Sequence, residues 1–161
     1  MMLKVIGILI KEFILMSKYF LDANFIISVF REIETNHELS VKICAELLEN
    51  HKCYISNSVL NEIITILMMR TKDMNLTINA YHFLKDNLII LDESEIYNFN
   101  DNVFEIFKKY NSDSFKVSFI DCSIVLLSKY FNLDYIVTYD KNFKLFEEIN
   151  LLELTNNIFK F

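Results

Sequence analysis

Residues 18–27 read KYFLDANFII, and this stretch decides the predicted fold. Its first four residues form a short apolar run with high β-propensity, and the run ends at Asp22. Residues 24–33 then follow the apolar spacing of a helix. Short apolar strands that are separated by helices pair in parallel through right-handed crossovers. We therefore expect this stretch to supply the first strand and the first helix of a parallel sheet.

The rest of the chain repeats this alternation of strand and helix. Further strands are expected at 53–55, 88–91 and 135–138, with a last candidate at 151–154. Helices are expected at 37–49, 57–70, 76–86, 94–110, 118–131 and 142–148. Asn57 or Ser58 is the expected cap of the second of these helices. The fold class is α/β, and we expect a three-layer α/β/α sandwich around a central parallel sheet.

The length of 161 residues indicates one domain, which we assign to residues 16–161. Residues 1–15, MMLKVIGILIKEFIL, are apolar but are interrupted by three charged side chains. Their longest uncharged run, residues 5–10, is far shorter than the roughly 20 residues that span a bilayer, so we expect no membrane insertion. Two readings stay open: an apolar extension that packs on the domain, or a mis-assigned start with translation from Met16.

The chain holds one glycine, Gly7, and no proline, which excludes several classes of enzyme. Phosphate-binding P-loops, dinucleotide-binding turns and nucleophile elbows need glycine where the backbone approaches a ligand or φ turns positive. The three cysteines include no CxxC pair and form no zinc-ligand set with the three histidines. Such sparse cysteines argue against a secreted disulfide framework and favour a cytoplasmic protein.

The balance of charge limits the kind of nucleic-acid binding that we expect. Sixteen basic and 22 acidic residues give a net charge of −6. Counterion release on a nucleic acid needs a basic surface, so a non-specific coat protein is excluded. A nuclease that neutralises its acidic residues with metal ions is not excluded.

Four acids are placed to meet at the edge where the parallel strands end, since function in such sheets gathers there. Asp22 and Asp140 follow predicted strands, Glu62 lies one turn into a helix, and Asp121 lies in the first turn of another. Each also has a local interpretation. The three aspartates are suited to helix capping, helix-dipole or turn positions, and Glu62 could be an ordinary solvated residue.

Carboxylates that are brought close together repel, and each raises the pKa of its neighbours. A divalent cation relieves that repulsion. Mg²⁺ and Mn²⁺ prefer oxygen ligands, retain several waters and bridge to phosphate oxygens. Such a site can activate water and clamp a phosphodiester for in-line displacement, and it requires no glycine loop, cysteine or histidine.

At this point four segments together resemble PIN domains. Residues 20–27, FLDANFII, resemble the first PIN motif, and residues 55–63, ISNSVLNEI, the second. Residues 121–124, DCSI, resemble the motif D-A-x-I, with Cys122 in place of alanine, and residues 138–143, TYDKNF, resemble T-x-D-x-x-F. The resemblance covers about residues 17–161 and is strongest to VapC-like toxins of VapBC toxin–antitoxin modules.

The resemblance implies a Mg²⁺- or Mn²⁺-dependent endoribonuclease of the PIN fold with one or two ions. Its metal-binding and catalytic residues would be Asp22, Glu62, Asp121 and Asp140. Asn24 and Thr138 would orient them. The implied partners are an RNA substrate, a small antitoxin protein and a second copy in a homodimer.

The RNA backbone would need cations, and the candidates near the motifs are Arg70, Lys116, Lys141 and Lys144. Each of them could equally be a plain solvated side chain.

The alternative function is a catalytically inactive PIN-like module that binds RNA or protein. A haloacid-dehalogenase phosphatase is disfavoured because its second aspartate is replaced by Asn24. A receiver domain is disfavoured because Asp22 lacks a paired acid.

Overall fold

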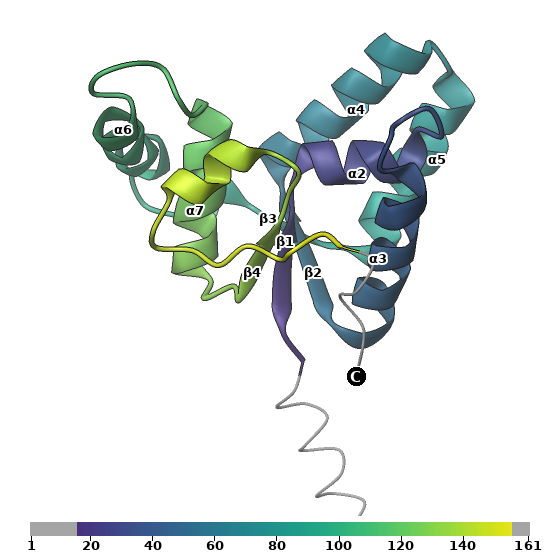
Figure 1. Ribbon diagram of the computed structural model, residues 1–161. Helices are drawn as coiled ribbons and strands as arrows, with labels where there is room; N and C mark the ends of the chain where they lie inside the picture. Colours follow the sequence, from purple (N-terminus) through teal and green to yellow (C-terminus); the bar gives the residue numbers. More distant parts are fainter. Residues whose placement is uncertain (1–15, 156–161) are drawn as a thin grey trace, which may run out of the picture.

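The computed structural model describes residues 16–155, and these residues form a four-stranded parallel sheet with helices on both faces (Figure 1). The strands are β1 (Lys18–Leu21), β2 (Lys52–Ser56), β3 (Ile89–Leu91) and β4 (Tyr135–Val137), in the spatial order β3-β2-β1-β4. All three strand pairs are parallel. The central strand β1 pairs through Tyr19 with Cys53 of β2 and with Tyr135 of β4.

The described helices are α2 (Ala23–Phe30), α3 (His37–Asn50), α4 (Asn57–Thr71), α5 (Met74–Asn87), α6 (Phe99–Tyr110) and α7 (Phe119–Tyr130). Two short 3₁₀ turns, η1 (Glu93–Glu95) and η2 (Lys141–Leu145), complete the set. No helix within residues 16–155 is long and apolar enough to cross a bilayer.

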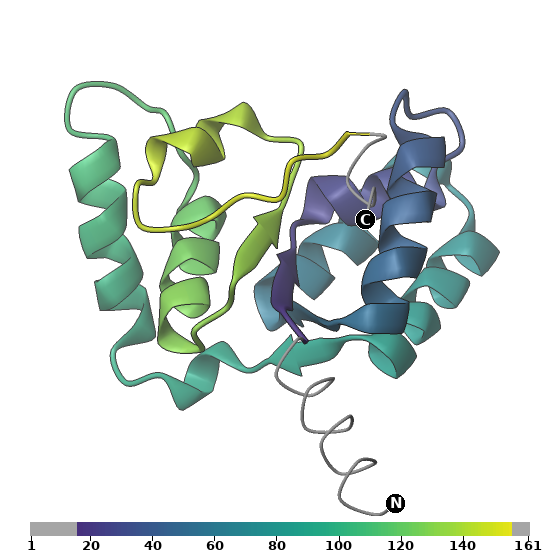
Figure 2. The ribbon, with the colours of Figure 1, turned by 60° about the horizontal axis from the view of Figure 1, so that its bottom comes forward.

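The order of the strands explains the layers. From β1 through β2 to β3 the chain moves in one direction across the sheet, so right-handed crossovers place α2 to α5 on one face. The chain then returns past two strands to β4, which places α6 and α7 on the opposite face. Figures 1 and 2 show this division. The predicted three-layer α/β/α sandwich with a parallel sheet is confirmed.

The core lies on both faces of the sheet, as its uninterrupted apolar strands require. Phe20 and Leu21 of β1 and Ile55 of β2 are fully buried. Helix ends are fixed by side-chain caps close to the strands. Ser56, the last residue of β2, accepts a hydrogen bond from the Val59 amide and so caps α4, in place of the expected Asn57 or Ser58.

Three elements differ from the sequence-based expectation. The expected helix 94–110 is divided, because Asp92 caps the short turn η1 and Asn98 adopts a left-handed conformation with φ 52° before α6 begins. The expected strand 151–154 is reduced to one bridge between Leu151 and Ile136. The expected helix 142–148 is the 3₁₀ turn η2. The two readings of residues 1–15 lie outside the described residues.

Candidate active site

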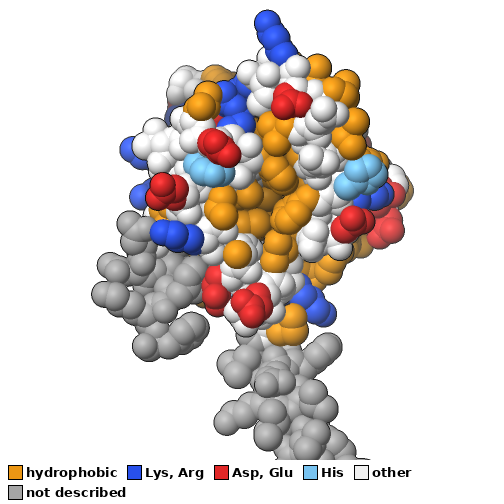
Figure 3. Space-filling view, turned by 90° about the vertical axis from the view of Figure 1, so that its right-hand side faces the viewer, with side chains coloured by type: hydrophobic (Ala, Val, Ile, Leu, Met, Phe, Trp, Pro, Cys, Tyr) orange, Lys and Arg blue, Asp and Glu red, His pale blue; other side chains and the backbone are white. Residues whose placement is uncertain are grey.

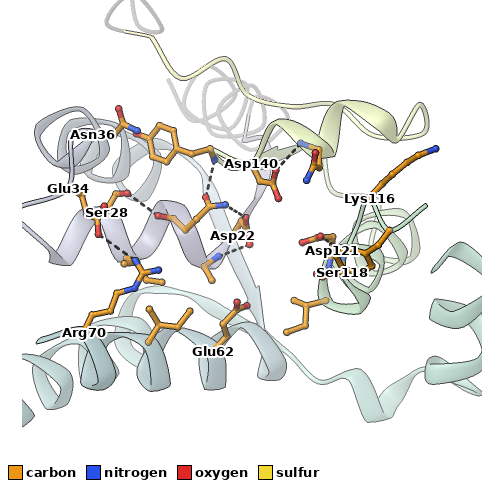
Figure 4. A pocket seen from close by; sticks show the side chains of 18 residues that line it. Asp22, Ser28, Glu34, Asn36, Glu62, Arg70, Lys116, Ser118, Asp121 and Asp140 are labelled. Atoms are coloured by element: carbon orange, nitrogen blue, oxygen red, sulfur yellow. Dashed lines mark hydrogen bonds and ion pairs between the residues drawn. The ribbon is translucent and has the colours of Figure 1, made fainter. Parts of the chain in front are cut away.

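A polar hollow of about 540 Å³ lies beyond the carboxyl ends of the strands. It lies beside β1 and β4, where the chain path reverses across the sheet, and this switch point is where open α/β sheets bind ligands. The structure brings all four predicted acids, Asp22, Glu62, Asp121 and Asp140, into its lining. Figure 4 shows their carboxylates arranged around one space.

Asp22 is the most constrained of these acids. It is the N-cap of α2 and is only 6% exposed. Its Oδ1 accepts a hydrogen bond of 2.7 Å from the Ala23 amide. Its Oδ2 accepts one bond from Asn24 Nδ2 and one from Thr138 Oγ1, both at 2.7 Å. The carboxylate therefore has a fixed orientation at the end of β1.

Asn24 and Thr138 join the ends of β1 and β4 around Asp22. Asn24 donates to Asp22 through Nδ2 and accepts from the Tyr139 amide through Oδ1 at 2.9 Å. Thr138 Oγ1 donates to Asp22 and accepts from the Asp140 amide at 3.0 Å. Two short polar side chains thus connect two acids that are 118 residues apart in the chain.

The other three acids are held more loosely. Asp121 forms a capping box at the start of α7: Ser118 Oγ accepts from the Asp121 amide, and Asp121 Oδ2 accepts from the Ser118 amide. Asp140 Oδ1 caps η2 by accepting from the Asn142 amide at 2.8 Å. The Glu62 carboxylate, on α4, forms no hydrogen bond or ion pair with any residue in the range 16–155. All three aspartates therefore do cap helices or turns, as their local interpretation predicted. Each also lines the hollow and keeps carboxylate lone pairs that its cap does not use.

The electrostatics of the hollow show that its acids interact. Burial raises the pKa of Asp22 to about 7, against hydrogen bonds from Thr138 and Ala23 that lower it, and the charges of Asp121 and Glu62 raise it further. Burial is also the main cause of the raised pKa of Glu62, and the charge of Asp121 raises it further. Burial likewise raises the pKa of Asp121, and the charge of Asp140 adds to this effect. The site therefore concentrates negative charge that the described residues leave uncompensated.

A family model for the PIN domain matches residues 19–149. This chain belongs to the PIN domain family. The sequence-based prediction of a PIN domain is thereby confirmed. A search of curated proteins gave no match.

Solved structures support the same fold. VapC20 of Mycobacterium tuberculosis, described as a toxin that cleaves the sarcin–ricin loop, aligns with a TM-score of 0.68 at 17% identity over 82% of this chain and 98% of its own. VapBC2 of Rickettsia felis, solved with a promoter DNA fragment, gives 0.65 at 18% identity over 83% and 96%. PAE2754 of Pyrobaculum aerophilum gives 0.60 at 13% identity over 84% and 83%. These likenesses show that the PIN domain has the fold of VapC toxins.

PIN nucleases in general use divalent metal ions, and the hollow is where the acids of this chain could hold one. Within residues 16–155, no three acidic, histidine or cysteine side chains lie in a geometry that holds an ion as they stand. The donor set nevertheless fits Mg²⁺ or Mn²⁺ by its chemistry, because it consists of carboxylate oxygens with unused lone pairs, and the pKa values of Asp22, Glu62 and Asp121 are raised.

The four predicted RNA-binding cations of the PIN domain fall into two groups. Arg70 and Lys116 line the hollow with the acids. Arg70 is held at its rim by Glu34, 3.6 Å away. Lys141 and Lys144 instead line a neighbouring depression of about 530 Å³ that also includes Thr138 and Asp140. Only the first pair shares the space of all four carboxylates.

Three further residues that line the hollow were not identified from the sequence. Ser118 orients Asp121, and the S-x-x-D spacing of residues 118–121 was a usable signal for that capping box. Ser28, one turn after Asn24, donates to the Asn24 carbonyl. Glu34 lies in the loop after α2. For Glu34 no local pattern was available, because its place depends on the packing of α2 against α4.

Replacing Thr138 by valine is expected to lower the free energy of unfolding by about 1–3 kcal/mol, since a hydroxyl that serves both Asp22 and Asp140 is lost at nearly constant shape. The pKa of Asp22 should rise further, because the hydrogen bond from Thr138 lowers it. Urea unfolding at pH 7 measures the first effect. Thr138→Ser keeps the hydroxyl and is the matched control. Wild-type stability in Thr138→Val would show that this hydroxyl does not hold the site together.

Proposed function

We propose that this protein is a Mg²⁺- or Mn²⁺-dependent endoribonuclease that hydrolyses phosphodiester bonds of RNA. The observation that carries the proposal is the arrangement of Asp22, Glu62, Asp121 and Asp140 around one hollow at the switch point of a PIN domain. We assign these four residues as metal ligands and as the catalytic carboxylates, with one or two ions. Asn24 and Thr138 are positioning residues, because their side chains hold the Asp22 carboxylate in place by hydrogen bonds.

The residues of the chain have separate parts in this chemistry. A bound ion would lower the pKa of a water and offset charge on the phosphate. Asp22 supplies a rigid ligand at the floor of the hollow, since three hydrogen bonds fix its orientation. Glu62 is half-buried and its carboxylate has no described hydrogen-bond partner, so one oxygen can bind the ion while the other accepts a proton from the attacking water. Asp121 and Asp140 complete the wall from α7 and η2.

The substrate class follows from the cations beside these acids. Arg70 and Lys116 lie on the lining of the hollow and are suited to contact phosphates on either side of the cleaved bond. Lys141 and Lys144 would contact more distant phosphates from the neighbouring depression. The described activity of VapC20 on the sarcin–ricin loop supports RNA as the substrate.

A PIN-like module that binds RNA or protein without cutting is the alternative function. This alternative is less well supported. The like charges of the four acids repel one another, and a module that does not cut RNA would have no use for that unfavourable arrangement. All four acids line the same hollow.

Incubation of the purified full chain with a structured RNA and Mn²⁺ is expected to give discrete cleavage products, and EDTA should stop the reaction. The ion offsets charge on the phosphate that the net acidic hollow cannot offset. The matched DNA strand, which lacks the 2′-hydroxyls, is the control for substrate class. Binding of the RNA without cleavage in any divalent metal would contradict the enzyme and support the inactive module.

We further propose that a small antitoxin protein is the partner and that the protein acts in the cytoplasm as a homodimer. The VapC-like fold and the VapBC2 structure support the toxin–antitoxin proposal. Figure 3 shows a band of hydrophobic side chains on the face that carries α3 and α5. Val41 on α3 and Ile78 and Tyr81 on α5 are among the exposed hydrophobic residues, and such a surface suits a protein partner. The three buried, unpaired cysteines are compatible with a reducing compartment.

A further inference from the structure

A cluster of phenylalanine rings lies on α6 and on the segment that leads into α7. Phe107 is its centre, with ring centroids 6.3 Å from Phe104, 6.5 Å from Phe115 and 6.0 Å from Phe119. Phe115 is 77% exposed, Phe104 49% and Phe119 39%. We call these four residues the phenylalanine cluster. Aromatic surface of this extent, left in water, indicates a binding surface.

The segment that carries Phe115 is anchored to α6. Asn111, after the last turn of α6, accepts hydrogen bonds from the Lys116 and Val117 amides at 2.6 and 3.1 Å. It also donates to the carbonyls of Phe107 and Val117. Val117 itself is only 1% exposed. The backbone that follows Phe115 is therefore anchored, while the Phe115 ring contacts Phe107 and stays largely exposed.

The cluster is continuous with the hollow of the carboxylates. Phe115, Lys116 and Ile120 line that hollow together with Asp121. In Figure 1 the segment between α6 and α7 lies at the same end of the sheet as the carboxyl ends of the strands. Phe115 is the ring of the cluster that lines the hollow, and Phe107 and then Phe104 follow it in ring-to-ring contact.

Basic side chains border the rings. Lys108 Nζ lies 5.4 Å from the centre of the Phe104 ring and pairs with Glu105. Lys116 forms no ion pair with another residue of the range 16–155 and extends from the rim of the hollow in Figure 4. Rings bordered by cations are the combination with which proteins hold single-stranded nucleic acid: the rings stack on bases while the cations contact phosphates.

We propose that the phenylalanine cluster stacks on unpaired bases of the RNA strand that enters the carboxylate hollow, and so forms a base-stacking subsite beside the four acids. The inference rests on the proposed function, because it takes RNA as the occupant of the hollow. RNA fits better than a protein partner, since the cluster opens directly into the acidic hollow and is bordered by lysines. In a duplex the bases are stacked on one another and cannot lie on these rings.

The test measures binding in EDTA, where no cleavage occurs. The probe is a ten-residue oligoribonucleotide that contains 2-aminopurine, whose fluorescence falls when the base stacks. The wild-type chain should quench the probe and bind it more tightly than its duplex with a complementary strand. Phe115→Leu, which keeps an apolar side chain at an exposed position, should weaken binding about tenfold and remove most of the quenching. Phe104→Leu should have a smaller effect in the same direction.

Two variants serve as controls. Phe115→Tyr keeps the ring and should bind as the wild type does. Tyr97→Leu removes an aromatic side chain that is 86% exposed outside the cluster and should change nothing. Equal affinity of wild type and Phe115→Leu, or equal affinity for duplex and single strand, would overturn the proposal. Unchanged RNA binding with loss of self-association in Phe115→Leu would assign the cluster to a protein interface instead. The binding assay contains no metal and does not depend on cleavage. Failure of the protein to cleave RNA with Mn²⁺ would contradict the proposed nuclease but would not change the outcome of the binding assay.

Discussion

Asp22→Asn should unfold at a higher temperature than the wild type at pH 8 in EDTA, and this advantage should disappear near pH 4. Few single substitutions of a buried residue stabilise a protein, since most core changes destabilise it. Asp22 is the exception expected here because its charge, not its shape, opposes folding. The same substitution should remove the response of the melting temperature to Mn²⁺.

The direction follows from the pKa of Asp22, which burial raises to about 7 in the folded protein. Between an ordinary aspartate pKa near 4 and this value, the folded state holds a proton that the unfolded state has lost. Stability from this group is therefore complete below pH 4 and is lost as the pH rises through 7. The difference corresponds to about 4 kcal/mol at most. The asparagine amide group takes the place of Asp22 Oδ2, which accepts from Asn24 Nδ2 and Thr138 Oγ1, so two hydrogen bonds of about 1 kcal/mol each are lost. A net gain of about 2 kcal/mol remains at pH 8.

The measurement is thermal unfolding of both proteins in EDTA at intervals from pH 4 to pH 8. Asp86→Asn, at an exposed position on α5, controls for the loss of one negative charge from the whole protein. It should shift the melting temperature little at any pH. A wild-type curve that is flat between pH 4 and pH 8, with no gain in Asp22→Asn, would show that Asp22 does not carry an unfavourable buried charge.

The sheet and its direction were predictable from the sequence because they depend on local patterns. The run 18–21 followed by Asp22 already contains an apolar strand, its end and a helix cap, and the same pattern recurs at 52–57 and 135–142. The elements that were mispredicted lack such a pattern. The break before α6 depends on a left-handed Asn98, a conformation that asparagine tolerates but does not require. Residues 151–154 are apolar enough for a strand, yet their pairing with β4 is limited to one isolated bridge, between Leu151 and Ile136.

The four acids of the candidate site, and Asn24 and Thr138 beside them, were predictable from the motifs, but their hydrogen bonds were not. Parallel strands bring their carboxyl ends to one edge, so Asp22 and Asp140 had to lie near one another once the sheet was assumed. The hydrogen bonds from Asn24 to the Tyr139 amide and from Thr138 to Asp22 depend on side-chain geometry between strands that are distant in sequence. The same holds for the division of the cations, since Arg70 and Lys116 reach the hollow only through the packing of α4 and α7.

Asp121→Asn is expected to lower Mn²⁺-dependent cleavage of RNA by two or more orders of magnitude while the protein stays folded. The helix cap should survive, because the asparagine Oδ1 can still accept the hydrogen bond that Asp121 Oδ2 accepts from the Ser118 amide. Stability in EDTA should stay equal or rise, since burial and the charge of Asp140 raise the pKa of Asp121 and its ionised form is unfavourable. What the variant loses is a charged ligand, and an amide oxygen binds Mg²⁺ or Mn²⁺ less strongly than a carboxylate.

Asp101→Asn separates this role from simple capping. Asp101 also lies in the first turn of a helix, α6, but it is exposed and is absent from the lining of the hollow. Both variants change one first-turn acid to its amide, so a difference between them in cleavage at saturating Mn²⁺ reports on the hollow alone. If helix capping were the only role of Asp121, both variants would cleave near the wild-type rate. Near-wild-type cleavage by Asp121→Asn, with the metal present, would remove Asp121 from the proposed ligand set and leave the site to the other three acids.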